Sequence, residues 1–438
     1  MKVLKFGGSS IATAPKMKEV AKLIQTKEKK IVVFSALSNM TNTLVEISDY
    51  LYKKNSDGAN EIINSLESDY LELVADLYSN EKYKNQVTDA LKEVFMSIRS
   101  YTKDLFTLFE EKVILAQGEL ISSVLMYYLL KQDDVKVAFI PALDFMRTDK
   151  NAEPDPIYIK EKLQKQLDAD PDREVYVTQG YICRNAYGEI DNLGRGGSDL
   201  TASLIGAAIQ AEEIQIWTDL DGMQNNDPRY VPDTAPVRNL QFEEAAELAY
   251  FGAKILHPTC IQPAKLSNIP VHLLNTQKPG APGTLISNCS EKKKIKAVAA
   301  KDGITVIKVK SGRMLLAHGF LRKVFEIFEN YQTAIDMIAT SEVGVSVTID
   351  NVRNLTGILD DLKKYGTVTV EENMSIVCVV GDLDWKNLGF ETRVIDALKE
   401  VPVRMISYGG SNYNISFLIK TNDKQITLRA LSEQLFKI

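Results

Sequence analysis

The sequence is poor in the residues that many enzymes use as bases, nucleophiles and metal ligands. Its 438 residues contain 3 histidines and 4 cysteines, which are scattered and form no CxxC pair. A zinc site, a histidine-based catalytic triad and a disulfide framework are therefore not expected. Cysteines of this kind indicate free thiols in a reducing compartment, which predicts a cytoplasmic protein.

Long apolar runs and an excess of positive charge are also lacking. No uninterrupted apolar stretch reaches the length of a membrane span, and the first residues do not form the apolar core of a secretory signal. With a net charge of −6 and no long basic patch, nucleic acid is not an expected partner. The content of 45% hydrophobic and 25% charged residues is ordinary for a globular protein, and the length suits two or three domains.

A glycine-rich turn at residues 193–199 is the most informative stretch that is present. It reads Leu-Gly-Arg-Gly-Gly-Ser-Asp and opens directly into an apolar helical pattern over residues 200–211. Glycines let backbone N–H groups approach a ligand, and the helix dipole adds positive potential there. With Arg195 and Asp199 in the same turn, the pattern favours a small charged ligand beside phosphate. An ordinary loop with turn glycines is the alternative, because a single match of this kind is unspecific.

A second glycine-rich turn lies near the N-terminus. A short strand at residues 3–6 runs into Lys-x-Gly-Gly-Ser-Ser, so Lys5 offers a charge while Gly7, Gly8 and Ser9 offer hydrogen-bond donors. The turn is not a Walker A loop, because the GxxxxGK[ST] pattern is absent. From the residues alone, an exposed strand lysine explains this stretch equally well.

Strand-like and helix-like segments alternate up to residue 275. This alternation predicts a mainly parallel α/β sheet with ligands at the carboxyl ends of its strands. A charged helical stretch at about residues 57–115 interrupts it and is interpreted as an insertion. The strands are expected at residues 3–6, 31–36, 136–142, 174–181, 214–219 and 271–275.

A Pro- and Gly-rich segment followed by a lysine run, at residues 278–294, marks the predicted domain boundary. Beyond it the order strand, Gly-Phe, helix, two strands occurs twice, with the Gly-Phe pairs at residues 319–320 and 389–390. Paired small α/β units suit ligand sensing at a shared interface. A dimerisation module would explain the repeat equally well. The expected domains are residues 1–290 and 291–438, the latter divided into about 304–370 and 371–438.

The charged residues of the turns point to phosphoryl transfer. Lys5, Arg195, Arg229 and Lys254 lie at or near turns, and no histidine or cysteine base accompanies them. Phosphoryl transfer is catalysed mostly by positioning and charge stabilisation. A carboxylate acceptor fits this pattern, because it is already ionised at neutral pH and needs no base.

Several short motifs, in this order, resemble those of the monofunctional aspartate kinases, which have the amino acid kinase fold. The C-terminal repeat is similar to the paired ACT domains of the same enzymes, so the resemblance covers essentially the whole chain. Each motif is weak alone, but together with the repeat they are highly specific. The motifs lie at residues 5–10, 118–119, 193–199, 217–219 and 251–258.

This resemblance implies a fold and an activity. The fold is a mainly parallel α/β sheet sandwiched by helices, followed by two ferredoxin-like ACT regulatory units. The activity is ATP-dependent phosphorylation of the side-chain carboxylate of L-aspartate to 4-phospho-L-aspartate, on the route to lysine, threonine and methionine. Mg²⁺ is implied to bind through the nucleotide phosphates, with no metal site on the protein itself. A homodimer or homotetramer formed through the ACT domains is expected, with no membrane partner.

The resemblance also assigns the site residues. Lys5 and Asp199 are implied as catalytic, with Asp199 orienting Lys5. The residues implied to hold aspartate are Thr41, Glu119, Arg195 and Ser198. The residues implied to contact ATP are Lys5, Gly7, Gly8, Ser9, Thr218, Asp219, Gln224, Arg229 and Lys254. Gln224 stands where familiar members carry a tyrosine near the nucleotide, so this position lacks an aromatic ring.

Two of these roles agree with the chemistry of the side chains. Arg195 can bind the α-carboxylate of aspartate through two parallel hydrogen bonds, and Glu119 can pair with the α-ammonium. From the residues alone, however, Glu119 reads first as an acid in the first turn of a helix, where it complements the helix dipole.

An effector site is implied in the first ACT-like repeat. Lysine is the favoured effector and threonine the second candidate. Ala317 and Ala334 stand where serines are expected in lysine-sensitive members. The residues implied to bind the effector are Met314, Phe320, Leu321, Asp336, Thr340, Ser341 and Glu342.

Other functions compete with this interpretation. A non-catalytic amino-acid sensor is disfavoured by the intact Lys5, Glu119, Arg195 and Asp199. A kinase for another acid or carbamate is disfavoured by the ACT-like repeat and by Glu119, which only an α-amino acid would require. A dehydrogenase is disfavoured because Asp199 stands where the dinucleotide fingerprint needs glycine. A fused homoserine dehydrogenase is not expected, since the sequence stops just after the second repeat.

Overall fold

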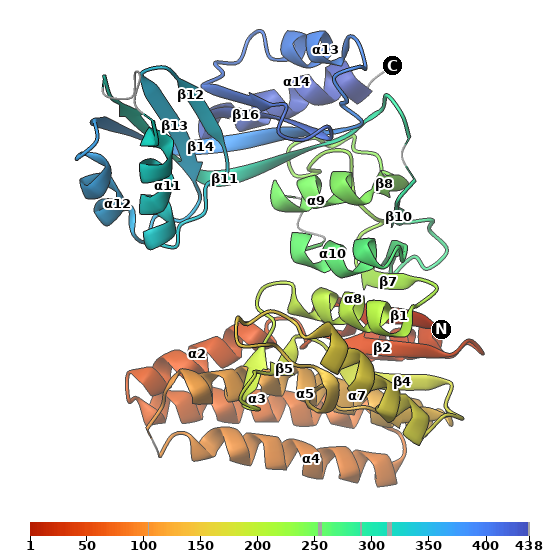
Figure 1. Cartoon of the computed structure of the whole chain (residues 1–438). Helices are drawn as coiled ribbons and strands as arrows, with labels where there is room; N and C mark the ends of the chain where they lie inside the picture. Colours follow the sequence, from red (N-terminus) through yellow and green to blue (C-terminus); the bar gives the residue numbers. More distant parts are fainter. Residues whose placement is uncertain (104, 253–255, 290, 313–317, 437–438) are drawn as a thin grey trace. The chain divides into compact units, whose positions relative to one another are not determined.

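The computed structural model describes residues 1–438 except 104, 253–255, 290, 313–317 and 437–438 (Figure 1). It divides into two compact units. Met1–Met223 and Ile255–Cys289 form the first unit, and Gln224–Lys254 and Ser290–Ile438 form the second.

The first unit is built on a mainly parallel sheet with the strand order β3-β4-β2-β1-β7-β9-β10. All neighbours in this order are parallel except β10, which runs antiparallel to β9. Its central strands are buried on both faces, as their runs of Val, Ile and Phe predict. The strands are β1 (Lys2–Phe6), β2 (Lys30–Phe34), β3 (Val137–Phe139), β4 (Val175–Gln179), β7 (Ile214–Thr218), β9 (Val271–Asn275) and β10 (Thr284–Ser287). The predicted α/β class is confirmed.

Helices cover both faces of this sheet. On one face, Leu4 and Phe6 of β1 join a continuous apolar core with the N-terminal helices. On the other face α8 (Gly197–Ile209) lies so close that a Cβ on Gly206 would be 2.6 Å from Ile214 Cδ1. The N-terminal helices are α1 (Ala14–Ile24), α2 (Met40–Tyr52), α3 (Ser56–Leu77), α4 (Glu81–Ser100) and α5 (Leu108–Gln132).

The stretch interpreted as an insertion contains α3, α4 and the beginning of α5. Helix α5 is long and apolar enough to cross a membrane by composition, but 72% of its most apolar window is buried inside the protein. It is therefore placed as a core helix of the first unit. The remaining elements of this unit are η1 (Gly8–Ile11), α6 (Ala142–Phe145), α7 (Pro156–Ala169), α10 (Pro258–Leu266) and the hairpin of β5 (Ile182–Arg184) and β6 (Ile190–Asn192).

The alternation of side chains along β1 determines where Lys5 points. Leu4 and Phe6 face the core of the N-terminal helices, so Lys5 projects from the opposite face. That face is covered by α8, and Lys5 stands near the carboxyl end of β1. The alternation of side chains along β1 therefore directs Lys5 toward the beginning of α8.

The second unit contains an antiparallel sheet with the strand order β12-β13-β11-β14-β16-β15. Two separate apolar cores lie on it, one with α11 and α12 and one with α13 and α14. The strands are β11 (Ile295–Lys310), β12 (Ile338–Ser341), β13 (Gly344–Ile349), β14 (Thr367–Gly381), β15 (Met405–Tyr408) and β16 (Asn414–Lys420). The helices are α11 (Phe320–Asn330), α12 (Leu355–Leu362), α13 (Phe390–Ala397), η2 (Thr421–Asp423) and α14 (Lys424–Phe436).

The long strands β11 and β14 serve both repeats. Their pairing changes register around Lys301 and Ile304, which divides each strand into two halves. Ile307 and Val309 belong to the first core, whereas Val298 belongs to the second. The first half of β11 thus completes the second repeat, although it precedes the first repeat in the sequence.

A segment that the sequence places in the first domain belongs to the second unit. Gln224–Lys254, which includes β8 (Asn239–Gln241) and α9 (Phe242–Tyr250), packs against β11 and β14. The approach is close at Gly252, where φ is +119° and a Cβ would lie 2.3 Å from the Ala300 carbonyl oxygen. Composition along the chain indicated only the break near residue 290, because a tertiary contact of this kind leaves no compositional trace.

Candidate active site

Lys5 and the glycine-rich turn at residues 194–199 meet at a cavity in the first unit. Its volume is about 320 Å³, and it opens at the carboxyl ends of β1 and β2. Residues from five separated parts of the chain line it. The carboxyl ends of the strands are the usual place for a ligand in a parallel α/β sheet. The lining residues are Lys5, Ser35, Ala36, Thr41, Glu119, Tyr181 and residues 194–199.

A close ion pair joins the two turns. Lys5 Nζ lies 2.5 Å from Asp199 Oδ1, and only 12% and 11% of the two side chains are exposed. Asp199 stands in the first turn of α8, where the helix dipole favours a negative charge. The carboxylate therefore fixes the lysine at the strand end, close to the glycines of the first turn.

Gly8 allows the first turn to approach β2. A Cβ at this position would lie 2.4 Å from the Ala36 carbonyl oxygen, so a larger residue would displace the turn. The neighbouring Gly7 N–H donates to the Trp217 carbonyl oxygen at the end of β7. This contact puts Thr218 and Asp219 next to the same turn, and the Thr218 hydroxyl donates to Asp219 Oδ1 at 3.1 Å.

Glu119 lies in the interior of α5 and not at a helix start. The interpretation as a first-turn acid is therefore wrong, because a capping box formed by Thr107 and Glu110 begins the helix at Leu108. The Glu119 side chain is buried, and its Oε2 atom has no hydrogen-bond partner among the described residues. Burial raises the pKa of this carboxyl to about 8, against the opposing effects of the Ala36 backbone N–H and Lys5.

This pKa predicts a pH dependence of stability. Between about pH 4.5 and pH 8 the folded protein holds the Glu119 proton while the unfolded chain releases it, so the stability from this group is lost as pH rises through that window. Glu119→Gln removes the dependence. We compare the free energy of unfolding of the variant with that of the natural protein, both without ligand. The difference is expected to shift by about 1–3 kcal/mol in favour of the variant between pH 5 and pH 8. Urea unfolding at both pH values measures this, and a pH-independent difference between the two proteins contradicts it.

The turn that carries Arg195 packs against the start of α10. Gly196 has φ +74°, and a Cβ there would lie 2.4 Å from the His257 Cβ. The Cys260 thiol donates to the Gly196 carbonyl oxygen at 3.3 Å. Burial, followed by the nearby Arg195 charge, lowers the pKa of His257. Arg195 itself is exposed toward the cavity and has no carboxylate partner within the described part of the chain.

Tyr181 is a lining residue that the sequence analysis did not identify. Its φ is +67°, and its backbone N–H donates to Thr201 Oγ1 of α8 at 3.1 Å. Ser35 and Ala36 were also missed as lining residues. Their position directly after β2, at the same sheet edge as Lys5, is the signal that predicts their place.

Some predicted nucleotide residues fall in the second unit. The Arg229 guanidinium donates to both carboxylate oxygens of Asp227, with Nε to Oδ1 at 2.9 Å and Nη2 to Oδ2 at 2.6 Å. Gln224 bridges to Pro236 in an isolated β-bridge. Lys254 lies outside the described residues.

The predicted effector residues lie in the first repeat, where Asp336 is the most strongly engaged. The Tyr250 hydroxyl donates to Asp336 Oδ1 at 2.7 Å, and Lys301 Nζ lies 2.8 Å from the same atom. Lys301 also pairs with Asp350 at 2.9 Å. Asp336 Oδ2 is buried and has no hydrogen-bond partner in the described part of the chain. The other predicted residues are placed on α11, on β12 and just beyond it: Phe320, Leu321, Thr340, Ser341 and Glu342, while Met314 lies outside the described residues.

The fold and this cavity define a member of the amino acid kinase family with a C-terminal ACT domain. Residues 1–275 match the amino acid kinase family, and residues 377–435 match an ACT domain. The chain is 34% identical to aspartokinase 1, chloroplastic, of Arabidopsis thaliana over 99% of this chain and 80% of that protein. It is 31% identical to the lysine-sensitive aspartokinase 3 of Escherichia coli over 99% of both.

Solved structures agree with these relatives. Escherichia coli aspartokinase III in complex with aspartate and ADP, in the R-state, superposes over 100% of both chains with a TM-score of 0.85 and 30% identity. The same enzyme with lysine and aspartate, in the T-state, gives a TM-score of 0.77. The chain belongs to the aspartokinases (EC 2.7.2.4), and it is an aspartate kinase with ACT-mediated allosteric regulation.

Proposed function

We propose that the 320 Å³ cavity holds L-aspartate and that Lys5 acts on the phosphoryl group transferred to it from ATP. The Lys5–Asp199 pair carries the proposal, because it fixes one cation between two glycine-rich turns. Arg195 binds the α-carboxylate of aspartate, and Glu119 binds its α-ammonium. The ammonium charge lowers the raised pKa of Glu119, so the carboxyl gives up its proton when aspartate binds. Ser198 and Thr41 complete this pocket from α8 and α2.

The acceptor needs no general base in this mechanism. The side-chain carboxylate of aspartate is ionised at neutral pH and attacks the γ-phosphorus of ATP, while the β–γ bridging bond breaks and ADP leaves. Lys5 compensates the charge that develops on the transferring group. The turn at Gly7 and Gly8 holds that group, and because the Gly7 N–H already donates to Trp217, the Gly8 N–H is the donor that orients its oxygens. Ser9, Thr218 and Asp219 flank the same sheet edge and contact the nucleotide. Gln224, Arg229 and Lys254 are proposed as further contacts.

Mg²⁺ is proposed to arrive bound to the phosphates of ATP. Within the described residues, no group of three or more His, Cys, Asp or Glu side chains is arranged to hold a metal ion. The available cations and backbone donors are suited to phosphate oxygens, which fits a metal carried by the nucleotide. When bound, the ion neutralises charge on the phosphates.

Lysine is the proposed feedback effector, bound in the first ACT repeat. Asp336 Oδ2, which is buried and has no partner among the residues that the structure describes, supports this because it is a charged acceptor suited to an ammonium group. The name of the Escherichia coli relative also mentions lysine sensitivity. Threonine is the second candidate. A coupled ADP-release assay with L-aspartate, run with lysine, threonine or methionine, tests both activity and effector, and a response to threonine alone contradicts the choice of lysine.

Replacement of Asp336 is expected to weaken lysine inhibition. Asp336→Asn keeps the shape but removes the charge, so the lysine concentration for half-inhibition should rise about tenfold or more. Asp350→Asn is the matched control, because Asp350 pairs with the same Lys301 but lies 42% exposed. Equal shifts in the two variants would show that the ion-pair network, and not the effector contact, sets the response.

Three further properties complete the proposal. The product, 4-phospho-L-aspartate, leads to lysine, threonine and methionine. Assembly as a homodimer or homotetramer through the ACT domains is proposed, and size-exclusion chromatography with light scattering measures it. A cytoplasmic location is supported by the four free cysteines, three of them buried.

A further inference from the structure

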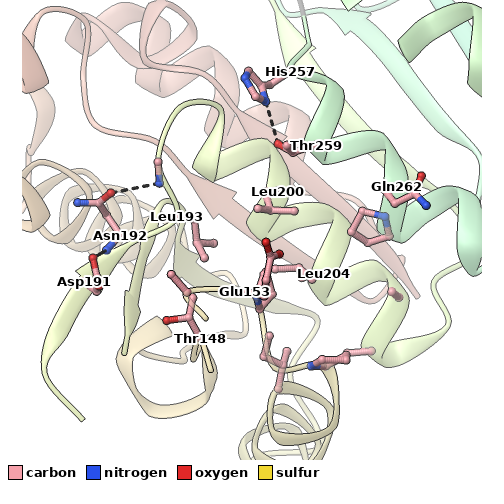
Figure 2. A pocket seen from close by; sticks show the side chains of 18 of the residues that line it. Thr148, Glu153, Asp191, Asn192, Leu193, Leu200, Leu204, His257, Thr259 and Gln262 are labelled. Atoms are coloured by element: carbon pink, nitrogen blue, oxygen red, sulfur yellow. Dashed lines mark hydrogen bonds between the residues drawn. The ribbon is translucent and has the colours of Figure 1, made fainter. Parts of the chain in front are cut away.

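The first unit contains a second and larger cavity beside the 320 Å³ cavity that is proposed to hold aspartate. Its volume is about 1000 Å³, which is at the upper end for small-molecule sites. It lies between α7, α8, α10 and the loop before α7 (Figure 2). Gly194 and Arg195 line both cavities, so the two sites share one turn of the backbone.

The walls of this cavity are mainly aliphatic. Leu200, Leu204 and Ala207 are spaced four and three residues apart, so they form one face of α8. The opposite face of α8 already packs against the sheet, as the contact of Gly206 with Ile214 shows. Leu200 and Leu204 are already buried, whereas Ala207 and Ala208 are only half-buried, so the cavity leaves the C-terminal part of this face open to a ligand.

Helix α10 supplies the facing wall. Pro263 and Leu266 line the cavity from this side, and Leu266 is 76% exposed. An exposed leucine at the rim of an aliphatic cavity would be covered by an apolar ligand that lies between α8 and α10. These contacts define the body of the ligand but not its charge.

The charged residues that line the cavity indicate the charge of its ligand. The cations Lys112, Lys160 and Arg195 exceed the carboxylates Glu153 and Asp191 by one. Lys112 pairs with Asp191 at 2.7 Å, whereas Arg195 has no carboxylate partner in the part of the chain described here. The balance of charge is therefore complementary to a ligand with a single negative charge, placed at Arg195.

We propose that this cavity binds an organic monocarboxylate with an apolar body larger than the side chain of an amino acid. The body lies between α8 and α10, and the carboxylate binds Arg195. Because Arg195 is also the proposed anchor of aspartate, the ligand and aspartate compete for one guanidinium. The effect on aspartate rests on the proposed function, whereas binding in the cavity doesn't.

Calorimetric titration with octanoate tests binding in the absence of substrates. Octanoate is expected to bind about tenfold more tightly than octan-1-ol, since only octanoate makes a charge-assisted hydrogen bond. In the ADP-release assay octanoate should raise the KM for aspartate and leave the KM for ATP unchanged. Equal binding of the alcohol, or no heat of binding at millimolar octanoate, overturns the proposal. Binding without competition overturns the role of Arg195 as the shared anchor.

Two variants locate the binding site. Ala208→Phe fills the cavity from α8, and Leu266→Asp puts a negative charge at its rim. Each should weaken octanoate binding about tenfold or more while the basal kinetics stay unchanged. Leu388→Asp is the matched control, because Leu388 is 94% exposed and lies in the second unit. Thermal unfolding shows whether each variant is folded, and unchanged octanoate affinity in folded Leu266→Asp overturns the placement.

Discussion

Arg195→Ala is expected to raise the KM for aspartate by about 10–100-fold while the KM for ATP changes less than about threefold. A bidentate, charge-assisted contact with a carboxylate accounts for an effect of this size. The arginine is exposed at its turn, and the turn is held by backbone and neighbouring contacts of Gly196, so the fold doesn't depend on the side chain. The selective loss therefore reports on aspartate and not on stability.

Arg195→Lys is the informative companion variant. Lysine keeps the positive charge but loses the planar fork, so its KM for aspartate should fall between those of the natural enzyme and Arg195→Ala. Steady-state kinetics with each substrate varied in turn measure the effect. Unchanged aspartate kinetics in Arg195→Ala would contradict the assignment of this residue to the α-carboxylate.

Lys5→Met is expected to lower kcat by about 100–1000-fold, which is the effect of removing one preorganised charge from a transition state. The same change leaves the buried carboxylate of Asp199 without its 2.5 Å partner. A loss of about 3–5 kcal/mol in the free energy of unfolding is expected from that uncompensated charge. Activity and stability would thus fall together in this variant.

The double variant Lys5→Met/Asp199→Asn separates these two effects. It removes the lone charge, so the unfolding free energy should recover most of the loss while kcat stays low. Denaturant unfolding and the ADP-release assay on the same samples measure this. Recovery of activity together with stability would show that the lysine holds the fold and has no direct part in the transfer.

The sheet and the two turns were predictable because local patterns determine them. Strands rich in Val, Ile and Phe alternate with helices, and glycines next to Lys5 and Arg195 indicate where the backbone approaches a ligand. The Gly-Phe pairs at the starts of α11 and α13 also predicted both helix boundaries, since each glycine has a positive φ at its N-cap. These signals act within a few residues of each other in the sequence.

The parts that were not predictable depend on contacts between distant residues. Glu119 looked like a helix-start acid because the capping box lies nine residues earlier, at Glu110. Tyr181 enters the cavity through a positive φ and a bond to Thr201, and neither is visible in its own sequence neighbourhood. The packing of Gln224–Lys254 against β11 likewise requires Ala300, which is far away along the chain.

The placement of Gln224–Lys254 has a consequence for building hybrid enzymes. The chain changes from one unit to the other after residues 223, 254 and 289. The regulatory unit is therefore not formed by the C-terminal segment alone. A chimera joined at the boundary near residue 290 would pair α9 of one parent with β11 of another, and the tight approach of Gly252 to Ala300 would have to survive the exchange. Transplanting the regulation therefore calls for two segments, with 224–254 carried across alongside 290–438.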